Sequence, residues 1–156
     1  MANDNPKGPR RSRHRKRGDP AADQRRALIK EAASARQRAV APYSRFKVGV
    51  ALLTEDGQMA TGANVESVSY GLSCCAERVA LLAALTAGMK RFVAMAIVAR
   101  ADGGVMPCGA CRQLLAEYAP QAKIWVADSR ALGVIREFSV AELLPDAFAA
   151  IPTNSD

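Results

Sequence analysis

The 156-residue sequence predicts one α/β domain, built as a three-layer αβα sandwich with a central mixed five-stranded sheet. Two observations support this fold class. Five short apolar runs have the length of strands, and three longer segments carry apolar residues at helical spacing. Helical and strand-like segments alternate along most of the chain, which is typical of a mixed sheet covered on both faces.

The first half of the domain is expected to hold a helix and then a β-hairpin. Residues 21–38 have alanine and leucine at helical spacing. Residues 46–54 and 59–65 are apolar runs of strand length. Asp56 and Gly57 lie between these runs, and an Asp-Gly pair is a strong signal for a hairpin turn.

The second half alternates helices with buried strands. The run RFVAMAIVAR is continuously apolar, the pattern of a strand that is buried on both faces of a sheet. We expect helices at about 75–87 and 108–119, strands at 91–100, 123–128 and 134–140, and a short helical turn over 141–148.

The net charge of +7 belongs mostly to one end of the chain. Residues 1–20 hold seven basic side chains against Asp4 and Asp19, whereas residues 21–156 hold 15 basic against 13 acidic ones. Residues 1–20 are poor in apolar side chains and are therefore expected to form a disordered tail before a folded domain over 21–156. A run such as RRSRHRKR can bind RNA or DNA electrostatically, and a solvated extension without a dedicated partner is the alternative.

No stretch approaches the ~20 consecutive apolar residues of a membrane span, so no membrane association is expected. No short apolar region follows the basic start, as it would in a secretory signal. We therefore expect a cytoplasmic protein.

The cysteines are clustered rather than spread along the chain. All four lie between positions 74 and 111, a distribution that fits metal ligation or catalysis better than a disulfide framework. A bond between the neighbours Cys74 and Cys75 would require a strained geometry. The only histidine, His14, lies in the basic tail, which argues against a histidine-based triad or a histidine metal ligand.

Two short motifs carry the chemistry, and each lies at an expected helix start. Cys75-Ala76-Glu77 forms a C-x-E motif, and residues 107–111 form P-C-x-x-C. Two cysteines at C-x-x-C spacing can bind one zinc ion, and a third ligand leaves the fourth tetrahedral position open, as in catalytic zinc sites. Glu77, two residues from a ligand, can then carry protons, and this paired motif is the signature of zinc deaminases.

The same motifs also occur in other kinds of site. A C-x-x-C motif alone also occurs in redox pairs and in structural zinc sites. A structural four-cysteine zinc would add Cys74, but adjacent residues seldom both bind one tetrahedral ion, and Glu77 would then have no role. Cys74 is instead expected to be a small buried apolar side chain beside the site.

Five segments together resemble the small zinc-dependent cytidine deaminases, over most of residues 25–150. They are YSRFKVGVAL, GANVESVSYG, CAERVA, PCGACRQLL and ELLPDAF. The resemblance implies a cytidine deaminase-like fold, one zinc ion per chain, and a homotetramer. It also implies hydrolysis of cytidine and 2′-deoxycytidine to uridine and 2′-deoxyuridine with release of ammonia, in pyrimidine salvage.

The resemblance also assigns roles to individual residues. It implies that Glu77 is the catalytic proton carrier and that Asn64 and Glu66 hold the ribose 3′-hydroxyl. Arg78 is implied to donate hydrogen bonds to the ligand sulfurs and so to offset their charge, a task that Arg112 could share unless it forms a surface salt bridge. The implied zinc ligands are Cys75, Cys108 and Cys111, and the implied substrate contacts are Phe46, Asn64, Glu66, Tyr70, Ala76 and Phe148. Phe148 is implied to close the pocket of a neighbouring subunit.

The sequence is also compatible with three other functions. One is a deaminase for a cytosine-containing antibiotic of the blasticidin type, against which the Asn64–Glu66 pair argues. The second is a nucleic-acid editing or binding protein that uses the basic tail. The third is a zinc module without catalysis.

Overall fold

The computed structural model describes residues 20–150. The basic tail was predicted over residues 1–20, and residues 1–19 of it lie outside the described range. Pro20, the last residue of the predicted tail, begins a helix. The elements in chain order are α1 (Pro20–Arg36), β1 (Val48–Thr54), β2 (Met59–Ala63), the 3₁₀ helix η1 (Tyr70–Leu72), α2 (Ala76–Thr86), β3 (Phe92–Ala99), α3 (Gly109–Tyr118), β4 (Lys123–Asp128), β5 (Ile135–Ser139) and α4 (Val140–Leu143).

The predicted elements are all present, most of them with small shifts at their ends. The helical turn predicted over 141–148 is the exception, because α4 has only four residues and ends at Leu143. The helix expected over 21–38 ends two residues earlier, at Arg36. Beyond it the backbone changes to tighter bonds, such as the one from Gln37 N to Ser34 O (3.1 Å). Among the described residues, none of the helices is long and apolar enough to cross a membrane.

The sheet has five strands in the order β2-β1-β3-β4-β5. β1 pairs antiparallel with both β2 and β3, and β5 pairs antiparallel with β4. β3 and β4 are parallel. The sheet is therefore mixed, as predicted.

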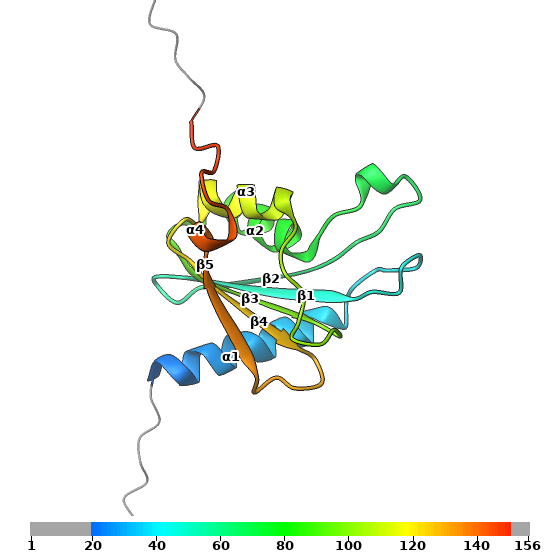
Figure 1. Cartoon of the computed structure of the whole chain (residues 1–156), viewed down its shortest axis with the longest axis horizontal. Helices are drawn as coiled ribbons and strands as arrows, with labels where there is room; N and C mark the ends of the chain where they lie inside the picture. The colour runs from blue at the N-terminus through cyan, green and yellow to red at the C-terminus, as the bar shows by residue number, and fades with distance from the viewer. Residues whose placement is uncertain (1–19, 151–156) are drawn as a thin grey trace, which may run out of the picture.

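Helices cover both faces of this sheet (Figure 1). α1 lies along one face, where Leu28 and Ile29 pack against Val98 and Trp125. α2, α3 and α4 lie on the opposite face. This arrangement confirms the predicted three-layer sandwich.

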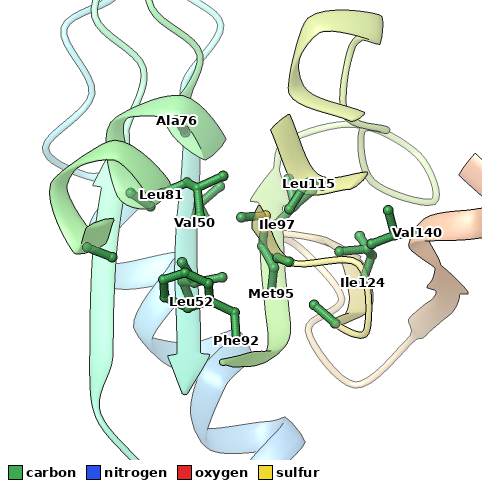
Figure 2. Packing of buried hydrophobic residues seen from close by; sticks show 14 of the residues in the cluster. Val50, Leu52, Ala76, Leu81, Phe92, Met95, Ile97, Leu115, Ile124 and Val140 are labelled. Atoms are coloured by element: carbon green, nitrogen blue, oxygen red, sulfur yellow. The ribbon is translucent and has the colours of Figure 1, made fainter. Parts of the chain in front are cut away.

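The larger of the two cores lies under α2 and α3 (Figure 2). Leu81 of α2 and Leu115 of α3 pack onto the strand residues Leu52, Met95 and Ile97. All five are at most 1% exposed, and burying each such side chain contributes about 1.5–3 kcal/mol relative to exposure. This core fixes both helices to the sheet, and both helices begin at the site described below.

α1 approaches β1 so closely that a glycine is required between them. A Cβ atom on Gly49 would lie 2.2 Å from the backbone oxygen of Ala32 and 2.2 Å from the backbone nitrogen of Arg36. Gly62 has the same role on the other face, where a Cβ atom would lie 2.5 Å from the carbonyl oxygen of Ala76. Gly62 therefore lets α2 begin directly against β2.

β3 explains why α2 and α3 begin close together. α2 precedes β3 in the chain and α3 follows it, both on the same face of the sheet. A helix that leads into a strand and a helix that leaves it run opposite to that strand when the connections are short. Both helix N-termini therefore lie at the carboxyl end of β3, near Ala99.

Candidate active site

Three thiols meet where α2 and α3 begin. The Sγ atom of Cys108 lies 3.9 Å from that of Cys75 and 3.5 Å from that of Cys111. All three sulfurs lie within 4.8 Å of one another. Cys75 is the N-cap of α2, Cys108 is the N-cap of α3, and Cys111 lies one turn into α3.

This arrangement fits a zinc ion. Tetrahedral zinc with bonds of ~2.3 Å to sulfur places its ligand atoms about 3.8 Å apart, close to the sulfur separations seen here. Thiolate is a preferred zinc ligand, and a three-sulfur set leaves one tetrahedral position for a water or substrate. All four cysteines of the chain are free thiols in the structure.

The start of α3 favours the thiolate form of Cys108. Burial alone would raise the pKa of this thiol, but its pKa is lowered overall. The opposing causes are hydrogen bonds with the backbone of Cys111 and Ala110 and with the neighbouring thiols. Backbone N–H groups at a helix N-terminus stabilise negative charge in this way.

Glu77 lies in the first turn of α2, directly beside the thiols. Its side chain is nearly enclosed, because the residue is only 6% exposed. Burial raises the pKa of Glu77, while a hydrogen bond with Cys111 and the charge of Arg78 act in the opposite direction. A carboxyl group whose pKa lies above its usual range is suited to both accepting and returning a proton.

A cavity of about 350 Å³ opens in front of these residues. Glu77, Cys75 and Cys108 are part of its wall, which is mostly apolar. The lining side chains are Ser44, Phe46, Val48, Asn64, Val65, Glu66, Ser73, Cys74, Cys75, Ala76, Glu77, Val105, Met106 and Cys108. A pocket of this size, apolar with a few polar groups, is typical of a small-molecule site.

The predicted substrate residues Phe46, Asn64, Glu66 and Ala76 all line this cavity. Asn64 also has a structural role, because its Oδ1 accepts a bond from Val48 N (2.8 Å) and its Nδ2 donates one to Phe46 O (2.9 Å). Glu66 accepts bonds from the backbone N–H groups of Tyr43 (3.0 Å) and Ser44 (3.1 Å). Both polar side chains thus hold the segment that carries Phe46.

Tyr70 and Phe148 do not line the cavity of their own chain. Tyr70 is 78% exposed on η1 and contacts the ring of Tyr43 edge-on, with 6.4 Å between ring centroids. It borders a neighbouring hollow that shares Ser44 and Glu66 with the cavity. Phe148 is 65% exposed, and its backbone oxygen accepts a bond from Gln113 (2.8 Å). Any role of these two aromatic rings in substrate binding requires another subunit.

The guanidinium group of Arg78 interacts electrostatically with the thiols. Its Nη2 donates a bond to Ser73 O (2.7 Å), and its Nε is buried with no hydrogen-bond partner among the described residues. Burial lowers the pKa of Arg78, because it disfavours the charged form. The charges of the four cysteines raise it by more, so the pKa of Arg78 is raised overall. This unpaired donor fits the predicted role of Arg78 in offsetting the charge of the ligand sulfurs.

Arg112 was predicted either to bond the ligand sulfurs or to form a surface salt bridge, but its hydrogen bonds go to backbone oxygens. Its Nε donates to the backbone oxygen of Pro107 (2.8 Å) and its Nη1 to that of Leu143 (2.8 Å). It therefore fastens the loop before Cys108 to the end of α4.

Cys74 lies beside the site as predicted, but it is half-buried rather than buried, and it lines the cavity. The backbone explains this position. Cys74 N donates to Val65 O (2.8 Å) and Val65 N donates to Cys74 O (3.0 Å), which holds residue 74 at the wall. The Cys74 thiol lies outside the three-sulfur group that could hold a metal ion.

Comparison with known proteins agrees with this geometry. The sequence model of the family described as "Cytidine and deoxycytidylate deaminase zinc-binding region" matches residues 22–127, which is more than half of the chain. The chain belongs to the cytidine and deoxycytidylate deaminase family. This membership confirms the predicted family and confirms zinc as the expected cofactor.

Individual members of the deaminase family are similar over most of their length. The cytidine deaminase of Halalkalibacterium halodurans is 50% identical over 83% of this chain and 98% of its own. The crystal structure of cytidine deaminase from Burkholderia pseudomallei is 49% identical, with a TM-score of 0.75, and the match covers 78% of this chain and 97% of that one. The crystal structure of cytidine deaminase from Mycobacterium tuberculosis is 41% identical, with a TM-score of 0.68, over 80% of this chain and 96% of that one.

Six cavity residues of this deaminase were not predicted from the sequence: Ser44, Val48, Val65, Ser73, Val105 and Met106. Val65 lies between the predicted residues Asn64 and Glu66, and Val48 lies two residues after Phe46. A signal existed for Val105 and Met106, because they directly precede the P-C-x-x-C motif. Ser44 and Ser73 carried no such signal, since their place in the wall depends on contacts with distant segments.

Proposed function

We propose that this deaminase hydrolyses cytidine and 2′-deoxycytidine to uridine and 2′-deoxyuridine, consuming one water and releasing one ammonia. The observation that carries this proposal is the position of the Glu77 carboxyl group, which is buried beside three thiols and lines a nucleoside-sized cavity. Cys75, Cys108 and Cys111 would hold the zinc ion. When bound, zinc supplies a Lewis acid that brings the pKa of water near neutrality.

Glu77 moves the protons of this reaction. Its carboxylate accepts a proton from the water that adds to C4 of the pyrimidine. It returns this proton to N3. It then accepts the second proton, from the new hydroxyl group on C4, and donates it to the amino group, so that the C4–N bond breaks and ammonia leaves. The enclosed position of Glu77 suits this role, because a buried carboxyl group holds a proton at higher pH than an exposed one.

The cavity walls position the nucleoside. Phe46, Val48, Val105 and Met106 provide apolar surface for a pyrimidine ring. Asn64 and Glu66 lie two residues apart and would take the ribose 3′-hydroxyl. A site that buries such polar groups discriminates strongly against a base without the sugar, because those groups then stay unpaired.

A direct assay tests the proposal. Purified protein with measured zinc content is mixed with cytidine, and the ultraviolet absorbance of the pyrimidine is followed. We expect one zinc per chain and steady conversion to uridine. Bound zinc without any change in cytidine absorbance would instead indicate a zinc module without catalysis.

The same assay separates the antibiotic-deaminase alternative. Blasticidin S, a cytosine-containing antibiotic, is offered beside cytidine at equal concentration. We expect cytidine to be the better substrate because Asn64 and Glu66 are both present in the cavity wall. Preference for blasticidin S would overturn the nucleoside assignment.

We propose that the working form is a homotetramer. The segment around η1 carries apolar side chains that have little cover in a single chain, with Val68 80% and Leu72 75% exposed. Tyr70 and Phe148 add aromatic surface of the same kind. Exposed apolar side chains grouped in this way favour association with another subunit.

The tetramer proposal has its own test. Light scattering coupled to size-exclusion chromatography gives the number of chains in solution. We expect four chains for the wild type and for Phe148→Ala, with a lower kcat/KM in the variant. A monomer with full activity would contradict both the assembly and the role of Phe148.

We propose further that residues 21–156 form the catalytic domain and that the protein works in the cytoplasm, in pyrimidine salvage. The free thiols support this location, because zinc-binding cysteines need a reducing compartment. Deletion of residues 1–20 is expected to leave cytidine turnover unchanged. Salt-sensitive binding of RNA or DNA by the intact chain, lost on deletion, would favour the nucleic-acid alternative.

A further inference from the structure

One side chain in the cavity wall, Ser44, links the two groups that face a bound nucleoside. Its hydroxyl group donates a hydrogen bond to Oε1 of Glu66. The Oγ atom of Ser44 in turn accepts a hydrogen bond from the backbone N–H of Phe46 (2.9 Å). The carboxylate and the aromatic residue are therefore fixed to each other through a single hydroxyl.

The backbone of this turn needs such support. Arg45, between Ser44 and Phe46, has a φ of 57°, in the left-handed region that is unfavourable for a residue with a side chain. Conformations of this kind persist where surrounding bonds over-determine them. Here Glu66 accepts the backbone N–H groups of Tyr43 and Ser44, and Ser44 in turn accepts that of Phe46.

The Glu66 carboxylate has one hydrogen-bond position left for a ligand. A carboxylate offers roughly four lone-pair positions for hydrogen bonds. Three positions of Glu66 are taken, by the Ser44 hydroxyl and by the backbone N–H groups of Tyr43 and Ser44. These bonds also lower the pKa of Glu66, with the Ser44 hydroxyl as the largest cause, so the group stays an acceptor. One position is left for a single hydroxyl group in the cavity.

We infer that Ser44 is a positioning residue that aims the last free acceptor of Glu66 at one sugar hydroxyl while holding Phe46 against the base. The inference rests on the proposed function, because it names how that site selects a nucleoside. Ser44 itself makes no contact with the reacting atoms. Its removal should therefore weaken recognition of the sugar more than it weakens the fold.

The test compares two substrates that differ by that hydroxyl, cytidine and 3′-deoxycytidine. A hydrogen bond to a charged group predicts that wild type prefers cytidine by roughly 10- to 100-fold in kcat/KM. In Ser44→Ala the ratio of the two kcat/KM values is expected to fall to about threefold or less, mainly through a higher KM for cytidine. Ser44→Thr keeps the hydroxyl and should restore the preference.

A matched control is available at the far end of β1. Thr54 also donates a hydroxyl bond to a carboxylate, Asp56 (2.5 Å), and accepts a backbone N–H, that of Gln58 (2.9 Å). Thr54→Val removes these bonds without touching the cavity. Melting temperature and zinc content are measured for both variants, and only Ser44→Ala should change the substrate preference.

The outcomes are distinct. An equal loss of kcat/KM for both substrates in Ser44→Ala, or a wild type that treats the two alike, would overturn the inference. Failure of the wild type to convert either substrate would overturn the proposed function itself. If Ser44→Ala does not fold, Ser44→Cys, with a weaker donor, is measured instead and should give a preference below that of wild type; an unchanged preference would overturn the inference.

Discussion

The Sγ atom of Cys75 lies 3.9 Å from the Sγ atom of Cys108, although the two residues are 33 positions apart in the chain. The contact exists because α2 and α3 begin at the same end of β3. It joins the C-x-E motif to the P-C-x-x-C motif.

Replacement of Cys75 should remove both metal and activity. Cys75→Ala leaves two of the three thiols, and we expect zinc content well below one per chain with cytidine turnover abolished. Cys74→Ala is the matched control, since Cys74 lies outside the three-sulfur group. Metal analysis of the purified proteins, followed by the absorbance assay, checks this. Loss of zinc from the Cys74 variant would contradict the ligand assignment.

Replacement of Glu77 should separate metal binding from catalysis. Glu77→Gln keeps the shape of the side chain but cannot carry the proton, so zinc content stays near one per chain. Turnover should fall by about 10²- to 10⁴-fold, the usual contribution of general acid–base catalysis. Glu31→Gln, on the exposed side of α1, should behave as wild type. Retained activity in Glu77→Gln would rule out its role as proton carrier.

A methyl group at Gly49 should disrupt the packing of α1 on the sheet. In Gly49→Ala the new Cβ atom would lie 2.2 Å from backbone atoms of α1, so the helix has to move. We expect a loss of about 3 kcal/mol or more in the free energy of unfolding. Gly133→Ala, where nothing lies within 4 Å of the added atom, should change it by less than about 0.5 kcal/mol. Urea titrations measure both, and equal stability of the two variants would contradict the observed helix position.

Glu137 should make stability depend on pH. Hydrogen bonds from Lys123 Nζ and Trp125 Nε1, both 2.8 Å, lower the pKa of Glu137 below 4.5. A carboxyl group with a lowered pKa stabilises the fold above its unfolded-state pKa, and this contribution is lost as the pH falls through its folded-state pKa. Unfolding curves of wild type and Glu137→Gln should therefore differ at pH 7 and converge near pH 3.

The exposed ion pair between Glu55 and Arg91 provides the control for that experiment. An exposed pair contributes little to stability, so Glu55→Gln should match wild type at both pH values. A constant difference between wild type and Glu137→Gln from pH 7 to pH 3 would show that the carboxylate charge has no part in the effect.

Much of the fold could be predicted because its signals are local. The five apolar runs and the Asp56-Gly57 turn mark elements whose spacing follows from strand and helix geometry alone. The parts that could not be predicted depend on contacts between distant segments. The half-exposed position of Cys74 results from pairing with Val65, and the role of Arg112 results from the end of α4 reaching the loop before Cys108.

By itself, the sequence determined the elements, the family and the two motifs that carry zinc chemistry, because each is written in residues that are neighbours along the chain. The tertiary structure decided that Cys75 meets Cys108, that Ser44 joins Glu66 to Phe46, and that Tyr70 and Phe148 are exposed outside the cavity of their own chain. The first relationship is set by the direction of β3 and by the packing of α2 and α3 on the sheet. The second depends on the backbone pairing of Val40 with Asn64 and Glu66, which brings the two segments together. Local periodicity determines which face of a helix is buried, but it contains no information on which distant residue that helix will meet.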